Sequence, residues 1–385
     1  MCCDAPARCM IKMIKYYSGY HGCDRCIQEG VYVTGTGVTF PCTSNQLRTD
    51  ESFRSEIDEA HHNGRSPLLN ISINMVADFP HDYLHLLCEG IGKRMLKKWI
   101  NGCPPNVLPR STINRINQYM LKSVQSVPSE FSRKPRSLNH VGLWKATEFR
   151  LFYLYIGLII LRRVLPKEML KHFLLYFTIW RILAHPVYSN STEWLNYAKD
   201  LVVIFIEQSR HLYGEGFIVY NVHSLIHLVE DVRRFGCIDV FSCFKFENFM
   251  RFLRKKVHSA NSPLSQAVRR IHENDVTCGL LSKYQPPKLM DLSDKEPNCY
   301  FLDLQGRIGK IVVLQGSTVK ANYFDRLSNN AFEFPLASSE FGIYLLGKLK
   351  KHSVLVNIDN ISAKIFLTKL DVDCLAIPIL HSGYE

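Results

Sequence analysis

The chain has 385 residues, a net charge of +12 and a pI near 9.0, with 46% hydrophobic and 11% aromatic residues. This length and apolar content exclude a disordered chain and predict two or three domains with substantial buried cores. The positive charge favours a polyanionic partner, nucleic acid first and an anionic membrane surface second. A basic protein without such a partner is the alternative.

The thirteen cysteines are odd in number and lack the regular spacing of a disulfide framework. We therefore expect a reducing compartment, in which cysteines serve as core residues or metal ligands. The chain opens with residues 1–4 as the end of a strand rather than with a signal peptide. The most apolar run, residues 151–161, is too short to span a bilayer and predicts a buried helix, so no membrane partner is expected.

Residues 1–45 predict a strand that ends at Asp4, a helix opened by Pro6 and a hairpin over residues 31–40. Between helix and hairpin, Cys23 and Cys26 form a C-x2-C knuckle. In a reducing compartment this pattern is half of a zinc site or a redox pair, and a zinc site needs two more ligands from elsewhere.

Residues 46–65 predict a helix and an exposed loop, and Pro80 is expected to open the next helix. Four polar residues of that helix are spaced at i, i+3, i+4 and i+7, nominally on one face: Asp78, His81, Asp82 and His85. This spacing suits a metal site, but Asp78 as a helix cap and histidines satisfied by solvent or core are equally simple interpretations.

The region from 101 to 140 is rich in Pro and Ser and predicts a linker around a short helix at 112–124. Residues 141–235 carry long apolar faces at helical spacing and predict a block of mutually buried helices. From about residue 290, short β-branched and aromatic runs separated by turn residues predict a small all-β barrel or sandwich.

Between these two parts lies the stretch with the most chemical character. His223 and His227 are four residues apart, so on a helix both imidazoles can reach one metal ion. Glu247 follows on a helix whose apolar stripe is Phe246, Phe249, Leu253 and Val257, and whose opposite face carries Glu247, Arg251, Arg254 and His258. A carboxylate among cations suggests a site that handles phosphates.

Several motifs together resemble a known family: C-D-A-P-A-R, C-D-R-C, H-S-L-I-H, F-K-F-E-N-F and D-Y-L-H-L-L-C-E-G. Over roughly residues 1–275 the chain resembles the C-terminal part of CACTA (En/Spm)-type transposases of animal mobile elements. These are DDE recombinases related to the catalytic core of the V(D)J recombinase. The order and spacing of the motifs carry the resemblance: Asp4 precedes Cys23 by nineteen residues, and Glu247 follows His227 by twenty.

The resemblance implies an α/β fold with an all-α insertion. A partial ribonuclease H-like core with a zinc knuckle would occupy residues 1–45, and a helical insertion would occupy 46–235. The chain would return to the core over 236–280 with the last catalytic Glu, and a small β domain would follow at 290–385. Asp4 and Glu247 would be ligands of catalytic Mg²⁺ or Mn²⁺, and a structural zinc would bind Cys23, Cys26, His223 and His227. Asp82 and His85 would match a D-x-M-H helix of the family.

The implied activity is DNA strand cleavage and transfer at transposon ends or target DNA in the nucleus, with a homodimer left open. Because the sequence begins just before the second catalytic Asp, no residue matches the first, and the chain as given is expected to be inactive or nearly so. The alternative is a non-enzymatic nuclear DNA-binding or adaptor protein. A third interpretation gives these residues only structural roles. Two basic groups are expected DNA contacts: Arg251, Arg254, Lys255 and Lys256, and Lys93, Arg94, Lys97 and Lys98.

Overall fold

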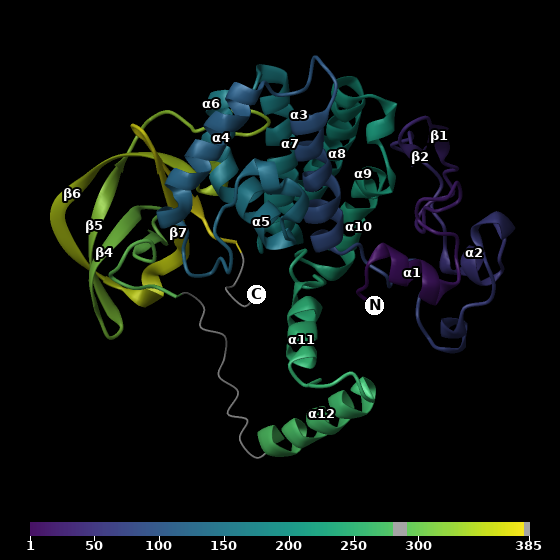
Figure 1. The fold of residues 1–385 in the computed structure, drawn as a ribbon. Coiled ribbons are helices and arrows are strands. Elements are labelled where there is room, and N and C mark those ends of the chain that lie inside the picture. The colour runs from purple at the N-terminus through teal and green to yellow at the C-terminus, as the bar shows by residue number, and fades with distance from the viewer. Residues whose placement is uncertain (280–290, 381–385) are drawn as a thin grey trace.

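The computed structural model describes residues 1–279 and 291–380, and its elements form four parts in chain order (Figure 1). An N-terminal segment lies against one end of a central helical block, and a β-barrel lies against the other end. A two-helix arm of α11 (Phe244–Arg254) and α12 (Pro263–Gly279) projects away from the block. Among the described residues, no helix is both long and apolar enough to cross a membrane.

The N-terminal segment contains two short helices, α1 (Ala5–Lys12) and α2 (Asp50–Arg54), and the hairpin β1 (Val31–Val33) and β2 (Gly37–Thr39). The hairpin confirms the prediction for residues 31–40. The helix opened by Pro6 is also confirmed, and the Asp4 carboxylate caps it by accepting a hydrogen bond from the Ala7 N–H at 2.8 Å.

The strand expected to end at Asp4 is reduced to a single parallel bridge between Cys3 and His81. Helix α1 begins immediately after Asp4, and the sheets of the described residues are the β1–β2 hairpin and the C-terminal barrel. A regular β-strand at Cys3 would need a neighbouring strand to pair with, and the described residues contain none there. The expected ribonuclease H-like core is therefore not confirmed.

The helical block confirms the prediction for residues 141–235 and extends it in the N-terminal direction. Two π-helical stretches, Leu84–Gly92 and Phe152–Ile156, alternate with the α-helices of the block. These are α3 (Lys93–Asn101), α4 (Arg110–Ser123), α5 (Ala146–Leu151), α6 (Gly157–Val164), α7 (Lys167–Ala184), α8 (Thr192–Tyr213), α9 (Tyr220–His223) and α10 (Leu225–Phe235).

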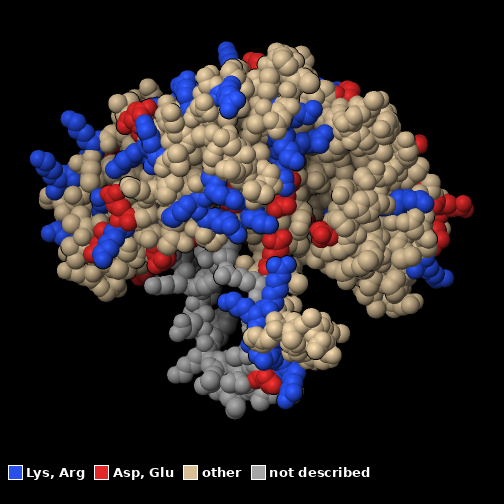
Figure 2. Space-filling model, in the orientation of Figure 1, with Lys and Arg blue, Asp and Glu red and all other residues tan. Residues whose placement is uncertain are grey.

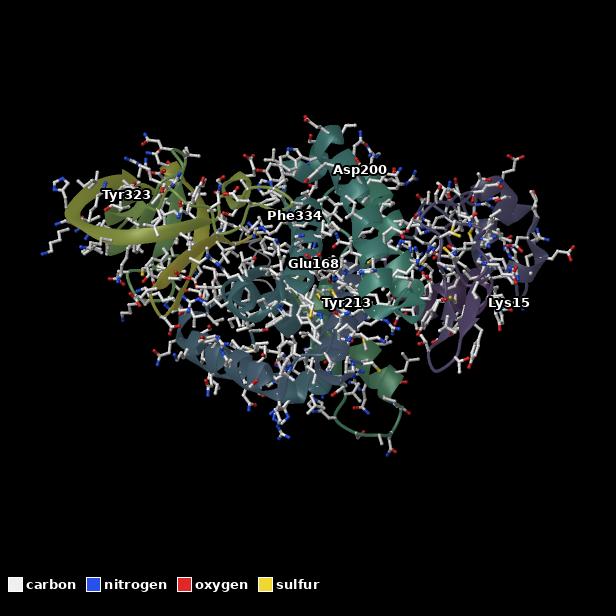
Figure 3. All side chains as sticks on the ribbon, turned by 90° about the horizontal axis from the view of Figure 1, so that it is seen from above. Lys15, Glu168, Asp200, Tyr213, Tyr323 and Phe334 are labelled. Atoms are coloured by element: carbon white, nitrogen blue, oxygen red, sulfur yellow. The ribbon has the colours of Figure 1, made fainter. Side chains whose placement is uncertain are left out.

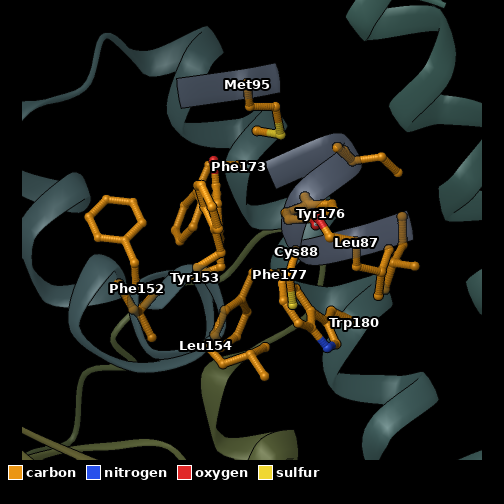
Figure 4. Close-up of a cluster of buried hydrophobic side chains, with 14 of the residues drawn as sticks. Leu87, Cys88, Met95, Phe152, Tyr153, Leu154, Phe173, Tyr176, Phe177 and Trp180 are labelled. Atoms are coloured by element: carbon orange, nitrogen blue, oxygen red, sulfur yellow. The ribbon is translucent and has the colours of Figure 1, made fainter. Parts of the chain in front are cut away.

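Aromatic rings fill the core of this block (Figure 4). Tyr176 lies 5.2 Å from Tyr153 and 5.6 Å from Trp180 between ring centroids, and its hydroxyl donates to the carbonyl of Leu87. The apolar run 151–161 is buried throughout, as its length predicted. Burial of side chains this large supplies most of the free energy that holds such a core together.

Helix α4 corrects the interpretation of residues 101–140 as a linker. The helix itself was expected, but its apolar residues Ile113, Ile116 and Met120 are buried in the same core as the rest of the block. Pro and Ser at both ends of α4 gave the region a linker-like composition. Composition alone does not reveal that a short helix between them is packed.

The helix expected to begin at Pro80 begins later, near Leu84. The backbone before it is fixed by tertiary contacts: Arg8 and Arg25 donate to the Phe79 carbonyl, and the His81 N–H donates to Asp231. Asp82, rather than Asp78, caps the helix through the His85 N–H.

The barrel confirms the predicted all-β part and closes in the order β3-β4-β5-β6-β8-β7 with antiparallel pairing. Its side chains join the helical core: Phe366 lies 5.6 Å from Phe131 and 5.4 Å from Tyr155 between ring centroids. A buried ion pair of 2.6 Å between Lys364 and Glu130 crosses the same boundary. The strands are β3 (Tyr300–Asp303), β4 (Ile308–Gln315), β5 (Thr318–Arg326), β6 (Tyr344–Asn357), β7 (Ile361–Leu370) and β8 (Asp373–Pro378).

Helix α11 forms where predicted, but its apolar stripe does not face the core. Phe246 and Phe249 are 56% and 51% exposed, whereas Phe244 at the start of the helix is 6% exposed. Helical periodicity identifies an apolar face correctly, yet it does not tell whether the described chain covers that face.

Candidate metal centre and acidic site

Four side chains, two from near the start of the chain and two from past its middle, converge beside the N-terminal segment. Cys23, Cys26 and His223 are fully buried and His227 is 6% exposed. Their sulfur and Nε2 atoms lie within 4.8 Å of one another, although Cys23 and His223 are 200 residues apart in sequence. The structure brings together the four ligands that the resemblance implied, and this cluster could hold a metal ion such as zinc.

The distances within the cluster match the edges of a tetrahedron around zinc. Zn–S and Zn–N bonds of normal length predict edges of about 3.8 Å (S to S), about 3.6 Å (S to N) and about 3.4 Å (N to N). The two sulfurs are 3.5 Å apart and the two Nε2 atoms 3.4 Å apart. Sulfur-to-nitrogen distances are 3.5 Å for Cys23–His227 and 3.3 Å for Cys26–His223. Two thiolates and two imidazoles in a closed, buried arrangement are typical of a structural zinc site.

Local structure places each half of the cluster. The knuckle is held by a short antiparallel contact in which the Ile27 N–H donates to Gln46 and the Arg48 N–H donates to Arg25. Helices α9 and α10 join at Ser224 without losing the helical turn, since the His227 N–H donates to the Ser224 carbonyl at 3.0 Å. The i, i+4 spacing therefore keeps both imidazoles on one side.

The pKa values of the cysteines and of His227 in the cluster favour the binding of a cation. Burial opposes ionisation of the Cys23 thiol, but hydrogen bonding from Cys26 and the two histidines outweighs it and holds the Cys23 pKa well below its ordinary value. The hydrogen bond to Cys23 raises the pKa of Cys26, so one thiol keeps the proton that a metal would displace. Burial lowers the pKa of His227, which leaves that imidazole neutral and able to bind a metal.

Two further side chains orient His223. The terminal amide of buried Gln28 lies 3.2 Å from His223 Nδ1, and the Phe40 ring stacks on the imidazole with centroids 5.3 Å apart. In the orientation that satisfies both of its polar atoms, the Gln28 amide nitrogen donates to His223 Nδ1 at 3.2 Å and its oxygen accepts from the Cys42 N–H at 2.8 Å. These contacts fix the orientation of the imidazole ring that presents Nε2 to the cluster.

A buried network of charges lies behind the knuckle and was missed by sequence reasoning. Asp24 accepts from Tyr220 at 2.8 Å and pairs with Arg8 and Lys12 of α1 at 3.5 Å. Burial opposes ionisation of Asp24, but Arg8 and Lys12 outweigh it and hold its pKa well below its ordinary value. The signal was the pair of charged residues between two cysteines in C-D-R-C, because a charge held inside a knuckle needs a buried partner.

His81 extends this network to α10. Its Nδ1 lies 2.7 Å from the Asp231 carboxylate, which also pairs with Arg25. His81 and Asp78 therefore contact different partners from Asp82 and His85, because Asp78 pairs with Arg234. The expectation that these four residues share one face is wrong, since the helix begins only after Asp82.

Asp82 and His85 instead form a dyad at the base of α11. One Asp82 oxygen lies 2.7 Å from His85 Nδ1, and the other accepts from the Cys243 N–H at 2.6 Å. Burial opposes protonation of His85, but the Asp82 hydrogen bond outweighs it and raises the His85 pKa. The other ring nitrogen, Nε2, lies 3.8 Å from the Glu247 carboxylate.

Asp4 and Glu247, the expected catalytic carboxylates, both adjoin this dyad. Asp4, Asp82 and His85 line one small cavity of about 20 Å³, and the charges of Asp4 and Glu247 both raise the His85 pKa. Partial burial raises the pKa of Glu247, and the nearby His85 imidazole acts in the opposite direction. Three acidic groups and one histidine are thus gathered at the junction of α1, the π-helical stretch and α11.

Two sulfur atoms lie beside the same dyad. Cys2 Sγ is 3.5 Å from Cys243 Sγ, and with Asp82 these residues form a second group of side chains spaced closely enough for a metal. Because Asp82 already accepts hydrogen bonds from Cys243 and His85, we interpret it as an organiser of the helix start.

The expected DNA-contact residues differ in how the structure uses them. Figure 2 shows Lys and Arg side chains gathered over the helical block and continuing along the arm. Arg254 at the end of α11 and Lys255 just after it are exposed, whereas the side chain of Arg251 lies outside the described residues. Lys256 is half-buried. Arg94 is anchored to the protein, since its guanidinium donates to the Gly216 and Phe217 carbonyls.

In comparisons with known proteins, no family model, no curated protein and no solved structure matches the chain.

Proposed function

We propose that the chain is a transposase-derived protein that carries a zinc-stabilised part of a DDE-type DNA strand-cleavage and transfer core. The observation that carries the proposal is the double convergence in one region. Cys23 and Cys26 meet His223 and His227, and Asp4 and Glu247 meet around His85. This arrangement supports the proposal, because the motifs whose order resembles the CACTA transposases lie in one region of the fold.

In this proposal zinc fixes the distance between the two halves of the chain. Cys23 lies in the N-terminal segment that also contains Asp4, and His227 lies on α10, shortly before α11 and Glu247. A metal that joins these ligands contributes several kcal/mol to their association. The hydrogen bond of Tyr220 to Asp24 and the ion pair of Arg25 with Asp231 reinforce the same contact.

Asp4 and Glu247 would hold the catalytic cation, with Asp82 and His85 as positioning residues. Bound Mg²⁺ or Mn²⁺ would activate the attacking oxygen and stabilise the leaving oxygen of a phosphodiester. Asp82 fixes the ring of His85, and its hydrogen bond raises the His85 pKa, which favours a positive charge beside Glu247. That charge would neutralise the carboxylate until a metal replaces it.

The first aspartate of a DDE triad has no counterpart among the matched motifs, so we expect cleavage near background from this chain alone. A partial ribonuclease H-like core made by the N-terminal segment and α11 is part of the proposal, as are DNA as partner and action in the nucleus.

Metal content tests the zinc half of the proposal. Purified protein should contain about one zinc per chain, and the Cys26→Ser/His227→Ala double variant should lose it. A matched variant with one exposed Cys and one exposed His changed, Cys103→Ser/His211→Ala, should keep it. Intact protein without zinc would contradict the proposal.

Manganese binding tests the acidic half without relying on turnover. Electron paramagnetic resonance should detect a bound Mn²⁺ in the intact chain and lose it in Glu247→Gln, whereas the exposed Glu207→Gln should bind as before. Equal binding in both variants would remove Glu247 from the site.

A non-enzymatic DNA-binding or adaptor role is the second candidate, favoured by the exposed apolar stripe of α11. Mn²⁺ binding separates the two, because the chain alone is expected to nick DNA near background under either proposal. Mn²⁺ binding that disappears in Glu247→Gln supports the strand-cleavage core, and DNA binding without Mn²⁺ binding supports the second.

A further inference from the structure

A basic cavity of about 850 Å³ opens next to the acidic site. Its walls come from α3, the turn after α3, the end of α8 and the loop that leads to α9. Tyr213, labelled in Figure 3, contributes an aromatic wall at the end of α8. Two of the sequence features discussed above reach this wall: the basic run of α3, and Glu89 and Gly90 at the end of the D-Y-L-H-L-L-C-E-G motif.

The charge of this cavity is concentrated in three lysines, Lys93, Lys97 and Lys98. In the part of the chain that the structure describes, no carboxylate lies within ion-pair distance of any of the three, although Glu89 lines the same cavity. Lys93 and Lys97 are an i, i+4 pair of like charges, which disfavours the helix slightly unless an anion lies between them.

Arg94 has a different function in the same wall. Its guanidinium donates to the carbonyls of Gly216 and Phe217 and lies over the Phe217 ring at 5.4 Å. It therefore fixes the loop after α8 against α3 and keeps the cavity open. The lysines remain as the cations that can meet a ligand.

The cavity adjoins the acidic site through shared residues. Asn221 lines both the basic cavity and the small cavity of Asp4, Asp82 and His85. Glu89, on the rim of the basic cavity, is close enough to Glu247 to raise its pKa. A chain-like ligand could therefore lie in the basic cavity with its next unit at the carboxylates.

We propose that this cavity binds the sugar–phosphate backbone of the DNA strand that enters the acidic site. The three lysines are spread along about 7.5 Å of helix rise, with Lys93 and Lys97 on one side of α3 and Lys98 about 100° further round the axis. Cations spread over one cavity suit charges repeated along a polymer, whereas a small anion would need them to converge on one point. Lysine is a flexible point charge that binds phosphate without reading bases. The identification of the ligand as DNA rests on the proposed function, whereas the assignment of a phosphate-binding cavity does not.

Salt-dependent binding of the full chain to a labelled single-stranded oligonucleotide tests the assignment. The triple variant Lys93→Gln/Lys97→Gln/Lys98→Gln should bind at least roughly tenfold more weakly at low salt. The slope of log affinity against log salt should fall by about 2. The matched control removes three exposed lysines of the barrel, Lys320→Gln/Lys348→Gln/Lys351→Gln, and should bind within about twofold of the unchanged chain.

A footprint locates the strand. Among the described cysteines, only Cys103 and Cys42 are exposed, and Cys103 lines the basic cavity whereas Cys42 does not. Bound oligonucleotide should slow alkylation of Cys103 by a maleimide and leave Cys42 unaffected. Mass spectrometry of the alkylated peptides measures both rates in one sample.

Three results would overturn the proposal: equal loss in both triple variants, unchanged binding in the cavity variant, or Cys103 alkylation that DNA does not slow. Displacement of the strand by inorganic pyrophosphate at matched ionic strength, with a tight pyrophosphate complex, would assign a small-anion site instead. The result is separable from the proposed function, because Mn²⁺ binding at Glu247 does not use these lysines. DNA bound here without Mn²⁺ at Glu247 would uphold the cavity and refute the catalytic site.

Discussion

At the scale of single residues, Gln28 is the side chain on which the geometry of His223 depends most directly. Its amide lies 3.2 Å from Nδ1, on the side of the ring opposite the sulfurs. Second partners of metal-bound histidines fix the orientation of the ring that presents Nε2 to the metal.

We predict that Gln28→Leu, which keeps the volume but removes the amide, weakens zinc binding about 10- to 100-fold. Competition with a chromogenic chelator measures the affinity. Gln46→Leu, an exposed change in the same segment, is the control and should leave the affinity unchanged. Equal affinities for the two variants would show that Gln28 has no part in the site.

His172 gives the molecule an acid sensitivity far from the metal. It is fully buried, stacks on Phe205 and contacts Ser209, and burial lowers its pKa to about 3. An unfolded histidine titrates near 6.5, so between these values the unfolded state binds a proton that the folded state does not. Stability is therefore complete above pH 6.5 and falls as the pH drops toward 3.

We predict that lowering the pH from 7 to 5 destabilises the unchanged chain by about 2 kcal/mol more than it destabilises His172→Gln. Urea unfolding at the two pH values measures the difference. Glutamine retains a hydrogen-bonding group for Ser209 but does not titrate. Parallel pH profiles for the two proteins would refute the assignment to His172.

The ligand residues could be predicted from sequence, whereas their supports could not. C-x2-C and H-x3-H are patterns that recur because a metal demands them. Asp24, Asp231 and Gln28 carry no such pattern, because any buried hydrogen-bonding group at the right place would serve. Their partners lie up to 206 residues away, as for Arg25 and Asp231.

At the scale of elements, α11 shows what hydrophobic periodicity predicts about a helix and what it leaves undetermined. Its helix was expected and is present, and its first aromatic residue is buried while the next is exposed. Amphipathic spacing specifies a face, but the partner for that face is set by the tertiary fold. The π-helical stretches and the late start of the helix after Asp82 were missed because they follow from tertiary hydrogen bonds.

Replacement of Phe244 and of Phe246 should therefore differ sharply in effect. We predict that Phe244→Ala costs about 3–5 kcal/mol of unfolding free energy, because it leaves a cavity in the main core. Phe246→Ala should cost less than about 0.5 kcal/mol. Chemical denaturation of both variants measures this, and a large loss at Phe246 would mean that its ring is covered in solution.

At the scale of the whole molecule, the metal cluster is a long-range closure between the N-terminal segment and α10. Such contacts bring together parts separated by most of the helical block, and loop closure over this length is costly without a strong bond. The helical block and the barrel, in contrast, have apolar cores that do not depend on the cluster.

We predict that a zinc chelator releases the N-terminal segment first. Limited proteolysis after chelation should cut within residues 1–80 while the block and barrel remain resistant, and added zinc should restore protection. Uniform digestion of the whole chain would show that the cluster supports the entire fold instead.

The division into helical and β parts could be predicted from composition, but the contact between them could not. Strand patterns predict a barrel, whereas the docking of Phe366 against Phe131 and Tyr155 depends on shapes that no local pattern encodes. The expected ribonuclease H-like sheet came from the resemblance rather than from strand patterns, and the described residues do not form it.

The contact between the barrel and the helical block has a practical consequence for the design of truncated proteins. Phe366, Leu370, Leu375 and Ile377 belong to the same apolar interior as the helices. A protein truncated after residue 279 would expose this apolar surface to water and would be expected to aggregate on expression. Trials of smaller pieces should therefore trim the arm or the N-terminal segment and keep β7 and β8 attached to their helices.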